Sequence, residues 1–368
     1  MFFSLLALFY FIIGAIELFE VPVSKKIIAA VCLIPAFVLT AFRDVSVGCD
    51  TFTYSLVFEK LRYVDSIIDA LAWDRMEYGY VSISYLFSHM DLSFSQFQIA
   101  GSTFIYASFF LFLIRYSKNI GISCLVFLTM RYMFGPMNAA RMYWAMAVLW
   151  FAIPFVQKRC YLGFALLVLL ASFFQKAAFL FIFLYPLSLI KFTPKKIFLS
   201  FFIAGIIGYM GKPFFVFVTH TLGLYESYLN GQYLNFSGNV AVYLVFMIDA
   251  CLALFVLYNK KTEKNFFNQN LTASISIEKI CLCAILVILC CDIVGFNFTL
   301  MSRISDFYSF CWLILIPMTF MKMKNKMVAI ISLIMFALCL FSQFETIMSL
   351  RSNWYCVDPY SFNFGEIF

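Results

Sequence analysis

Residues 27–54 read IIAAVCLIPAFVLTAFRDVSVGCDTFTY, and their character changes after Phe42. The part up to Phe42 is apolar and uncharged, which is typical of a segment that crosses a membrane. The part that follows brings charged and polar side chains together around a glycine: Arg43, Asp44, Gly48, Asp50, Thr51 and Tyr54. An arginine and two carboxylates directly after an apolar helix indicate a polar site at the membrane surface.

The composition of the whole chain is that of a membrane protein with many spans. Its 368 residues are 64% hydrophobic and 12% charged, whereas soluble proteins carry about a quarter charged residues. A span of ~20 residues with its connection takes about 30 residues, so the chain has room for about ten to twelve helices. We therefore expect an all-α, polytopic integral membrane protein in which residues 1–368 form a single transmembrane domain.

Hydropathy and turn signals predict about twelve spans. They lie at about 2–20, 26–42, 96–114, 120–135, 141–156, 161–174, 177–190, 197–218, 240–258, 279–296, 304–320 and 327–345. The first is interpreted as a retained span, because no basic residues precede it and no cleavage pattern follows it. Lys and Arg concentrate on every second connection, so those connections are cytoplasmic and both termini lie outside. This pattern accounts for the net charge of +7 without a nucleic-acid partner.

The outer side receives three sizeable segments on this topology. The first is a long loop at about 43–95, whose apolar stretches, such as 78–90, predict interfacial or re-entrant helices instead of a free linker. The others are a second loop at about 219–239 and a C-terminal tail at about 346–368. We therefore expect the working surface on the outer side.

Five cations stand at or near the outer ends of predicted helices: Arg43, Arg131, Arg141, Lys176 and Arg303. A guanidinium stays charged when buried, and its donors match phosphate oxygens, so the cluster favours an anion with a hydrophobic tail, such as a lipid pyrophosphate. Snorkelling to lipid headgroups is the alternative for any single arginine. A pair with Asp306 one turn later is the alternative for Arg303.

Two interpretations of Asp50 stay open. It either caps a helix that begins at Thr51, or it stays ionised beside buried arginines and accepts a proton from a sugar hydroxyl. Asp44 and Glu77 are alternative candidates for that proton transfer. Asp249, inside a predicted span, is expected to pair two helices. A disulfide between Cys49 and Cys356 also stays open.

No outer group of His and acidic residues has metal-ligand spacing, and most of the cysteines lie inside apolar runs. Buried cysteines of this kind usually behave as small hydrophobic residues. We therefore expect neither a metal site nor a cofactor; the alternative is Mg²⁺ recruited by two outer carboxylates together with a pyrophosphate.

Several short motifs carry a resemblance to a known family. They are Arg43, Val47-Gly48-Cys49-Asp50-Thr51 with Tyr54, Glu77-Tyr78-Gly79-Tyr80, Asn138-Ala139-Ala140-Arg141, Gln157-Lys158-Arg159, Arg303 through Tyr308, Ile316-Pro317 and Asp358-Pro359-Tyr360. Together they resemble the EpsG-like family of bacterial polysaccharide polymerases, which are Wzy-type O-antigen polymerases. Two positions depart from the family pattern. Met142 stands where Gln commonly follows the arginine, and Gln175-Lys176-Ala177-Ala178 stands where His-x-Ser-Ala is often found.

The resemblance implies an enzyme of the bacterial inner membrane with its active face in the periplasm. Such enzymes transfer an undecaprenyl-pyrophosphate-linked glycan onto the non-reducing end of another lipid-linked repeat unit. Arg141 and Arg303, helped by Arg43, would stabilise the departing pyrophosphate without a metal, and Asp50 or Glu77 would activate the acceptor hydroxyl. Further substrate contacts are expected from Asp44, Thr51, Tyr54, Tyr80, Arg131, Lys176, Asp306 and Tyr308. The partners implied are membrane lipid, a chain-length regulator and a flippase.

The main alternative is a flippase or transporter of the same lipid-linked oligosaccharide. A flippase should place charges along a midplane cavity that is reachable from both sides. Here the cations gather at one face, and Asp249 is expected to stand nearly alone in mid-span. A third interpretation is another lipid-linked glycosyltransferase or ligase, which would share the arginines and differ in its acceptor.

Overall fold

The computed structural model describes residues 2–73, 76–211, 213, 216–217, 240–260, 274–298, 301–350 and 354–363. Within these ranges the regular structure is helical, and one isolated β-bridge joins Arg43 to Phe362. The predicted all-α class is confirmed. The chain forms two compact units, one of Met1–Phe155, Tyr161–Phe179 and Ile316–Phe368 and the other of Val156–Cys160 and Leu180–Leu315. Each is described by itself.

Among the described residues, three helices are long and apolar enough to cross a membrane. They are α6 (Phe94–Tyr116), α14 (Val240–Lys260) and α18 (Lys326–Leu350). Two bent pairs raise the number to five if each is one span: α7 (Ile120–Thr129) with Tyr132–Asn138, and α16 (Ser302–Tyr308) with α17 (Phe310–Met321). These helices support a multi-pass membrane protein. The larger number of about twelve spans stays a prediction.

Some of the predicted spans are short or irregular in the structure. The run 161–174 contains the twelve-residue α10 (Tyr161–Ser172). The run 177–190 consists of the 3-10 helix η2 (Lys176–Phe183) followed by α11 (Leu184–Leu189). Hydropathy averages over such interruptions, because it registers apolar side chains and not helical geometry.

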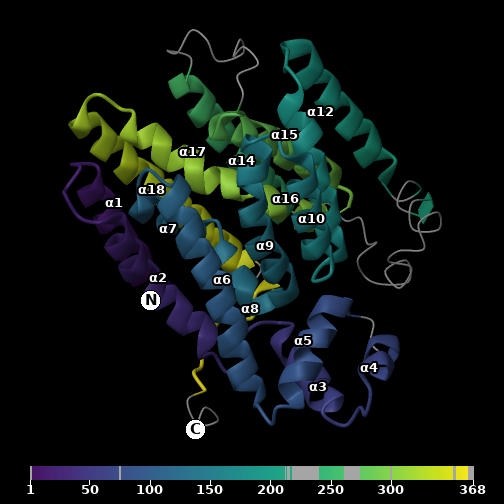
Figure 1. Cartoon of the computed structure of the whole chain (residues 1–368). Coiled ribbons are helices and arrows are strands. Elements are labelled where there is room, and N and C mark those ends of the chain that lie inside the picture. The colour runs from purple at the N-terminus through teal and green to yellow at the C-terminus, as the bar shows by residue number, and fades with distance from the viewer. Residues whose placement is uncertain are drawn as a thin grey trace. The chain divides into compact units, whose positions relative to one another are not determined.

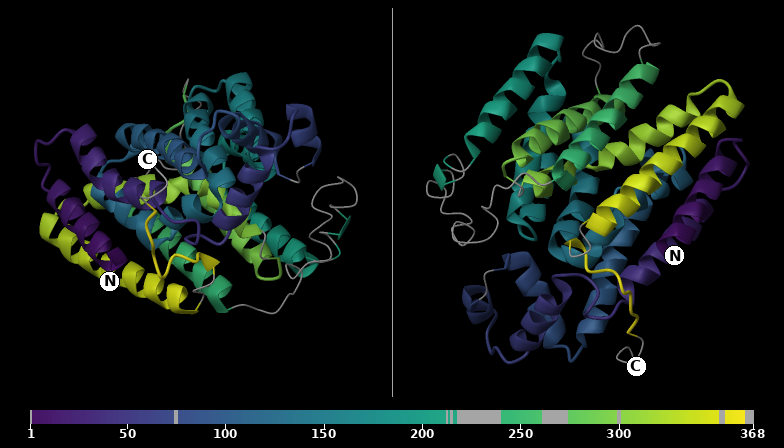
Figure 2. Two further views of the ribbon diagram at one scale, coloured as in Figure 1. Left: turned by 90° about the horizontal axis from the view of Figure 1, so that it is seen from below. Right: turned by 180° about the vertical axis from the view of Figure 1, so that it is seen from behind.

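Close backbone contact joins the first helices of the first unit. There, α1 (Phe2–Glu17) packs along α7, and α2 (Lys25–Ala41) packs along α6; α1 and α18 also lie side by side (Figure 2). A Cβ atom added to Gly121 would clash with the backbone of Gly14, so small residues allow α1 and α7 to approach closely. The Asn119 side chain donates to the Gly14 carbonyl at 2.8 Å and fixes the same contact.

The helical structure between α7 and α9 (Ala140–Gln157) is interrupted at Arg131. Arg131 has φ 66°, a left-handed conformation that is uncommon outside glycine and asparagine. The segment after it, η1 (Tyr132–Phe134) and α8 (Gly135–Asn138), is bent from α7 by 73°. This break turns the chain so that α9 begins one residue before Arg141.

Three helices occupy the predicted first outer loop: α3 (Thr51–Leu61), α4 (Ile67–Trp73) and α5 (Tyr78–Ser88). They lie together in Figure 1 and share a small core of Leu61, Ala70 and Val81. The prediction of helices instead of a free linker is therefore confirmed.

The C-terminal tail pairs with the beginning of this loop. Asn363 donates its backbone N–H to the Phe42 carbonyl at 3.0 Å, and Gly48 donates to the Cys356 carbonyl at 2.9 Å. Cys49 and Cys356 form a disulfide, which the sequence left open. Figure 2 (right) shows the yellow tail beside the chain that follows α2. Loop and tail thus lie on one side of any membrane that the chain spans. The predicted second loop, 219–239, is outside the described residues.

In the second unit, α15 (Ile277–Gly295) packs against α12 (Pro194–Tyr209), α14 and α16. The Asp292 carboxyl of α15 is hydrogen-bonded to the Asp249 carboxyl of α14, and both residues are buried. The expectation that Asp249 stands nearly alone in its span is wrong, because the Asp292 carboxyl of a different predicted span is hydrogen-bonded to it. Its expected role in helix pairing agrees with this contact.

Candidate functional site

An ion pair joins the first turn of α9 to the residue before α5. Arg141 donates from Nη1 to Glu77 Oε2. The Glu77 side chain is only 8% exposed, and its other oxygen accepts the backbone N–H of Lys176 at 3.3 Å. Both carboxylate oxygens are thus engaged, and Glu77 connects the loop, α9 and the start of η2.

Two tyrosines of the loop pack beside Arg141. The guanidinium of Arg141 lies 5.6 Å from the ring centroid of Tyr54, a cation–π distance, and its Nε lies 3.4 Å from the Tyr54 hydroxyl. The Tyr54 ring packs on Tyr80 at 5.3 Å. Burial raises the pKa of Tyr54 and of Tyr80, so both present neutral hydroxyl groups.

Arg43 is a buried cation that follows α2. Its side chain donates to the Thr40 carbonyl, whereas its Nε has no hydrogen-bond partner. No ion pair with a carboxylate is formed by Arg43 within the part of the chain that the structure describes. Burial lowers the pKa of Arg43 to about 10, so the group remains charged at neutral pH. A buried charge without a counter-ion is costly to the fold, which makes Arg43 a candidate functional residue.

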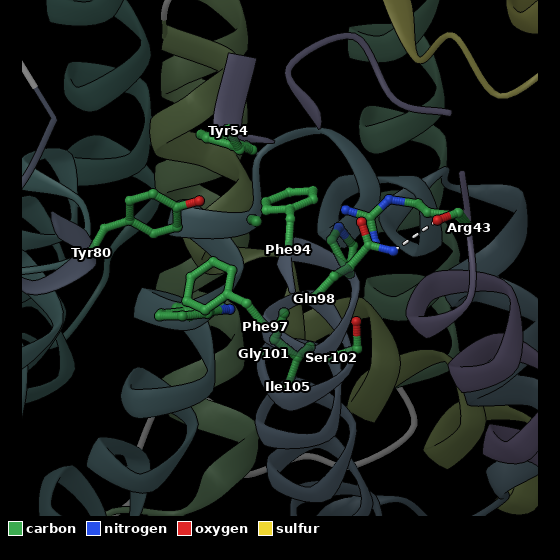
Figure 3. Close-up of a pocket in the computed structure, with 12 residues that line it drawn as sticks. Arg43, Tyr54, Tyr80, Phe94, Phe97, Gln98, Gly101, Ser102 and Ile105 are labelled. Atoms are coloured by element: carbon green, nitrogen blue, oxygen red, sulfur yellow. Dashed lines mark hydrogen bonds between the residues drawn. The ribbon is translucent and has the colours of Figure 1, made fainter. Parts of the chain in front are cut away.

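A small cavity of about 20 Å³ adjoins Arg43, Tyr54, Tyr80 and Trp144. Gln98 of α6 also lines it and donates from Nε2 to the carbonyl of Arg43 at 2.9 Å (Figure 3). The Gln98 Oε1 atom is buried without a partner. The space suits one water molecule and is too small for a phosphate group.

A larger groove of about 470 Å³ lies on the other side of the carboxylate. It is lined by Leu71, Ala72, Met76, Glu77, Tyr78, Ser172, Phe173 and Lys176. An apolar and aromatic wall with a few polar groups is typical of small-molecule sites of this size. Glu77 contacts Arg141 and also lines this groove, so its carboxylate lies between the Arg141 guanidinium and the groove.

The other loop candidates have local or structural partners. Asp50 is exposed at the N-cap position of α3 but makes no side-chain cap hydrogen bond, so the capping interpretation holds for its position only. Asp44 Oδ1 accepts from the N–H and hydroxyl of Ser46, which lowers the pKa of Asp44. Thr51 is buried, with Oγ1 2.8 Å from the Met137 carbonyl.

Two of the predicted cations, Arg131 and Lys176, differ in their exposure to solvent. Arg131 is buried and donates to Gln343 Oε1 at 2.8 Å, which ties the bend after α7 to α18. Lys176 is exposed and lines the groove beside Glu77.

Three predicted residues belong to the second unit. Arg303 is exposed in the first turn of α16, and Asp306 follows in the same helix. Tyr308 is buried, and its hydroxyl donates to the Leu180 carbonyl at 2.9 Å. Tyr308 therefore has a packing role, while its expected substrate contact stays a prediction.

The EpsG family model matches residues 25–362, which is almost the whole sequence. The chain belongs to the EpsG family. Membership associates it with exopolysaccharide biosynthesis, and the match includes every site residue from Arg43 to Lys176. Neither a curated protein nor a solved structure matches the chain.

Sequence reasoning about this EpsG-family protein missed some site residues. Gln98 and Trp144 line the small cavity, and Phe173 lines the groove. Gln98 carried a signal, since it is an amide at the start of a predicted span. Trp144 and Phe173 carried none, because aromatic residues are common throughout the chain.

Proposed function

We propose that this EpsG-family protein is a membrane glycosyltransferase that polymerises undecaprenyl-pyrophosphate-linked repeat units on the periplasmic side of the bacterial inner membrane. The observation that carries the proposal is the Arg141–Glu77 pair beside a buried second cation, Arg43. Transfer of a glycan from a lipid pyrophosphate to a hydroxyl needs a cation for the leaving group and a carboxylate for the proton.

In the proposed reaction the acceptor oxygen forms a bond to the anomeric carbon of the donor glycan. The bond from that carbon to the pyrophosphate oxygen breaks, and its electron pair leaves with undecaprenyl pyrophosphate. Arg141 contacts the leaving group. A phosphate contact by Arg303, which belongs to the second unit, stays a prediction from the sequence. Arg43 adds positive charge from the small cavity that it lines together with Tyr54 and Tyr80, since this cavity is too small to admit the phosphate. The guanidinium groups supply the charge, so the displacement is metal-independent.

Glu77 is the preferred proton acceptor. It contacts Arg141 and lines the groove, whereas Asp50 is exposed and lines neither described pocket. The groove would bind the acceptor sugar against Tyr78 and Phe173.

The periplasmic location is supported by the Cys49–Cys356 disulfide, because disulfides persist in oxidising compartments. The proposal retains about twelve spans in a single transmembrane domain. A flippase and a chain-length regulator are its expected partners.

One observation favours the flippase alternative. The hydrogen-bonded carboxyl pair of Asp249 and Asp292 is buried among apolar helices of the second unit, and intramembrane carboxyl groups are common in transport pathways.

The deciding experiment compares surface polysaccharide from a deletion strain complemented with wild type, Arg141→Ala or Arg115→Ala. Arg115 is an exposed arginine at the end of α6 and serves as the matched control. We expect the deletion to leave single repeat units, Arg115→Ala to restore the ladder, and Arg141→Ala to lower polymerisation by about 10²–10³-fold at normal membrane levels. Lipid-linked units trapped on the cytoplasmic face would instead support the flippase.

A further inference from the structure

The side chains of Arg141 and Glu77 form an ion pair with each other in the structure. One Glu77 oxygen accepts from the Arg141 guanidinium, and the other accepts the backbone N–H of Lys176 at 3.3 Å. Both oxygens are therefore directed at donors of the protein. While this pair persists, neither oxygen is free for an acceptor hydroxyl.

The Arg141 side chain is 22% exposed and lines neither of the two described pockets. The cavity lined by Tyr54, Tyr80 and Arg43 has about 20 Å³, too little for a phosphate. The groove has about 470 Å³, but Glu77 lines it and Arg141 does not. A pyrophosphate that reaches the guanidinium from the groove must therefore replace the Glu77 carboxylate.

The charges favour that replacement. A pyrophosphate carries more negative charge than one carboxylate, and a guanidinium binds phosphate oxygens through two parallel hydrogen bonds. The nearby cation Arg43 also favours the more highly charged anion. Glu77 lies directly before α5 in extended conformation, with φ −69° and ψ 142°, so its side chain can leave Arg141 without unwinding a helix.

We infer that Glu77 is a substrate-operated latch: it holds Arg141 in the free protein, and the donor pyrophosphate displaces it toward the groove, where it meets the acceptor hydroxyl. The groove is then the acceptor subsite. This inference rests on the proposed function and adds an order to it, because the donor must bind before the acceptor is activated. The acceptor proton passes to Glu77 as the acceptor oxygen bonds to the anomeric carbon and the pyrophosphate departs with the electron pair.

The latch makes a prediction that a positioning role does not. Glu77→Gln removes the charge that competes for Arg141, so undecaprenyl pyrophosphate should bind the purified protein in lipid nanodiscs more tightly, with a Kd lower by about tenfold. Glycan transfer by the same variant should fall by about 100-fold or more. Tighter binding with lost turnover is the expected signature.

Glu59→Gln is the matched control, because Glu59 also pairs with an arginine of the loop, Arg62, but on an exposed surface. Its Kd should equal that of the wild type. Glu77→Gln combined with Arg141→Ala should bind no tighter than Arg141→Ala alone. Should Glu77→Gln fail to fold, Glu77→Asp serves, since its shorter side chain reaches Arg141 less well and should tighten binding by a smaller factor.

Unchanged or weaker binding by folded Glu77→Gln would overturn the latch and assign Glu77 to positioning Arg141, with the proposed function intact. Equal binding by the wild type and Arg141→Ala would instead remove the pyrophosphate site itself, and the proposed function with it.

Discussion

The Asn138 side-chain oxygen accepts the backbone N–H of Cys49 at 2.6 Å. This bond joins the first outer loop to the segment that leads into Arg141. We expect Asn138→Ala to lower the free energy of unfolding by about 1–3 kcal/mol, because a partly buried N–H is left without its acceptor. Thermal unfolding of the purified protein measures the loss. Full stability of the variant would show that the bond is replaced by water.

Gly48 should not tolerate a side chain. It has φ 96°, and a Cβ atom there would clash with the Met137 carbonyl oxygen. Gly48→Ala is expected to cost about 1–3 kcal/mol and to reduce polymerisation, since the loop loses its register against α8. Gly205→Ala is the control, because nothing lies within 4 Å of its added Cβ. Equal melting temperatures for the two variants would contradict the prediction.

The buried charge of Arg43 is expected to destabilise the folded protein. Its charge is buried without a carboxylate partner among the described residues, so Arg43→Met should raise the free energy of unfolding by about 1–4 kcal/mol. The same change should weaken the binding of undecaprenyl pyrophosphate. A melting temperature below that of the wild type would indicate that the Arg43 hydrogen bond to Thr40 outweighs the desolvation cost.

Asp50→Asn should separate the two carboxylates proposed for proton transfer. Asp50 is exposed and makes no cap hydrogen bond, so transfer should stay within a few-fold of wild type, against a loss of about 100-fold or more for Glu77→Gln. Rates with lipid-linked repeat units provide the measurement. The reverse ranking would make Asp50 the base.

Removal of the Cys49–Cys356 bond should destabilise the loop and the tail together. We expect the double variant Cys49→Ser and Cys356→Ser to lose about 2–5 kcal/mol. A reducing agent should lower the melting temperature of the wild type and leave that of the double variant unchanged. A similar shift in both proteins would place the effect elsewhere.

Local patterns predicted much of the fold. Apolar runs indicated the helices, and the apolar stretch at 78–90 indicated helical structure in the loop, which α5 confirms. The left-handed conformation at Arg131 was not predictable, because hydropathy carries no information on φ. Nor was the Asp249–Asp292 contact, since it joins two helices through tertiary packing.

For the site, residue chemistry selected Arg43 and Arg141 as candidate cations and Glu77 as a candidate proton acceptor. The structure pairs Arg141 with Glu77, while the roles of the three residues stay predictions. Their pairing could not be derived. Arg141 and Glu77 are 64 positions apart, and only the packing of α5 against its surroundings selects Glu77 over Asp50 as the partner. The same applies to Tyr308, whose hydroxyl is engaged by a distant carbonyl.

The contact between the C-terminal tail and residues 42–49 also determines when the protein can complete its fold. The ribosome makes Cys49 early and Cys356 more than 300 residues later, at a sequence separation of 307. The tail can therefore pair with the region around Arg43 only after the last stretch of the chain has been made. A chain that ends before Cys356 lacks the tail that pairs with residues 42–49, so a truncated protein cannot complete this part of the fold.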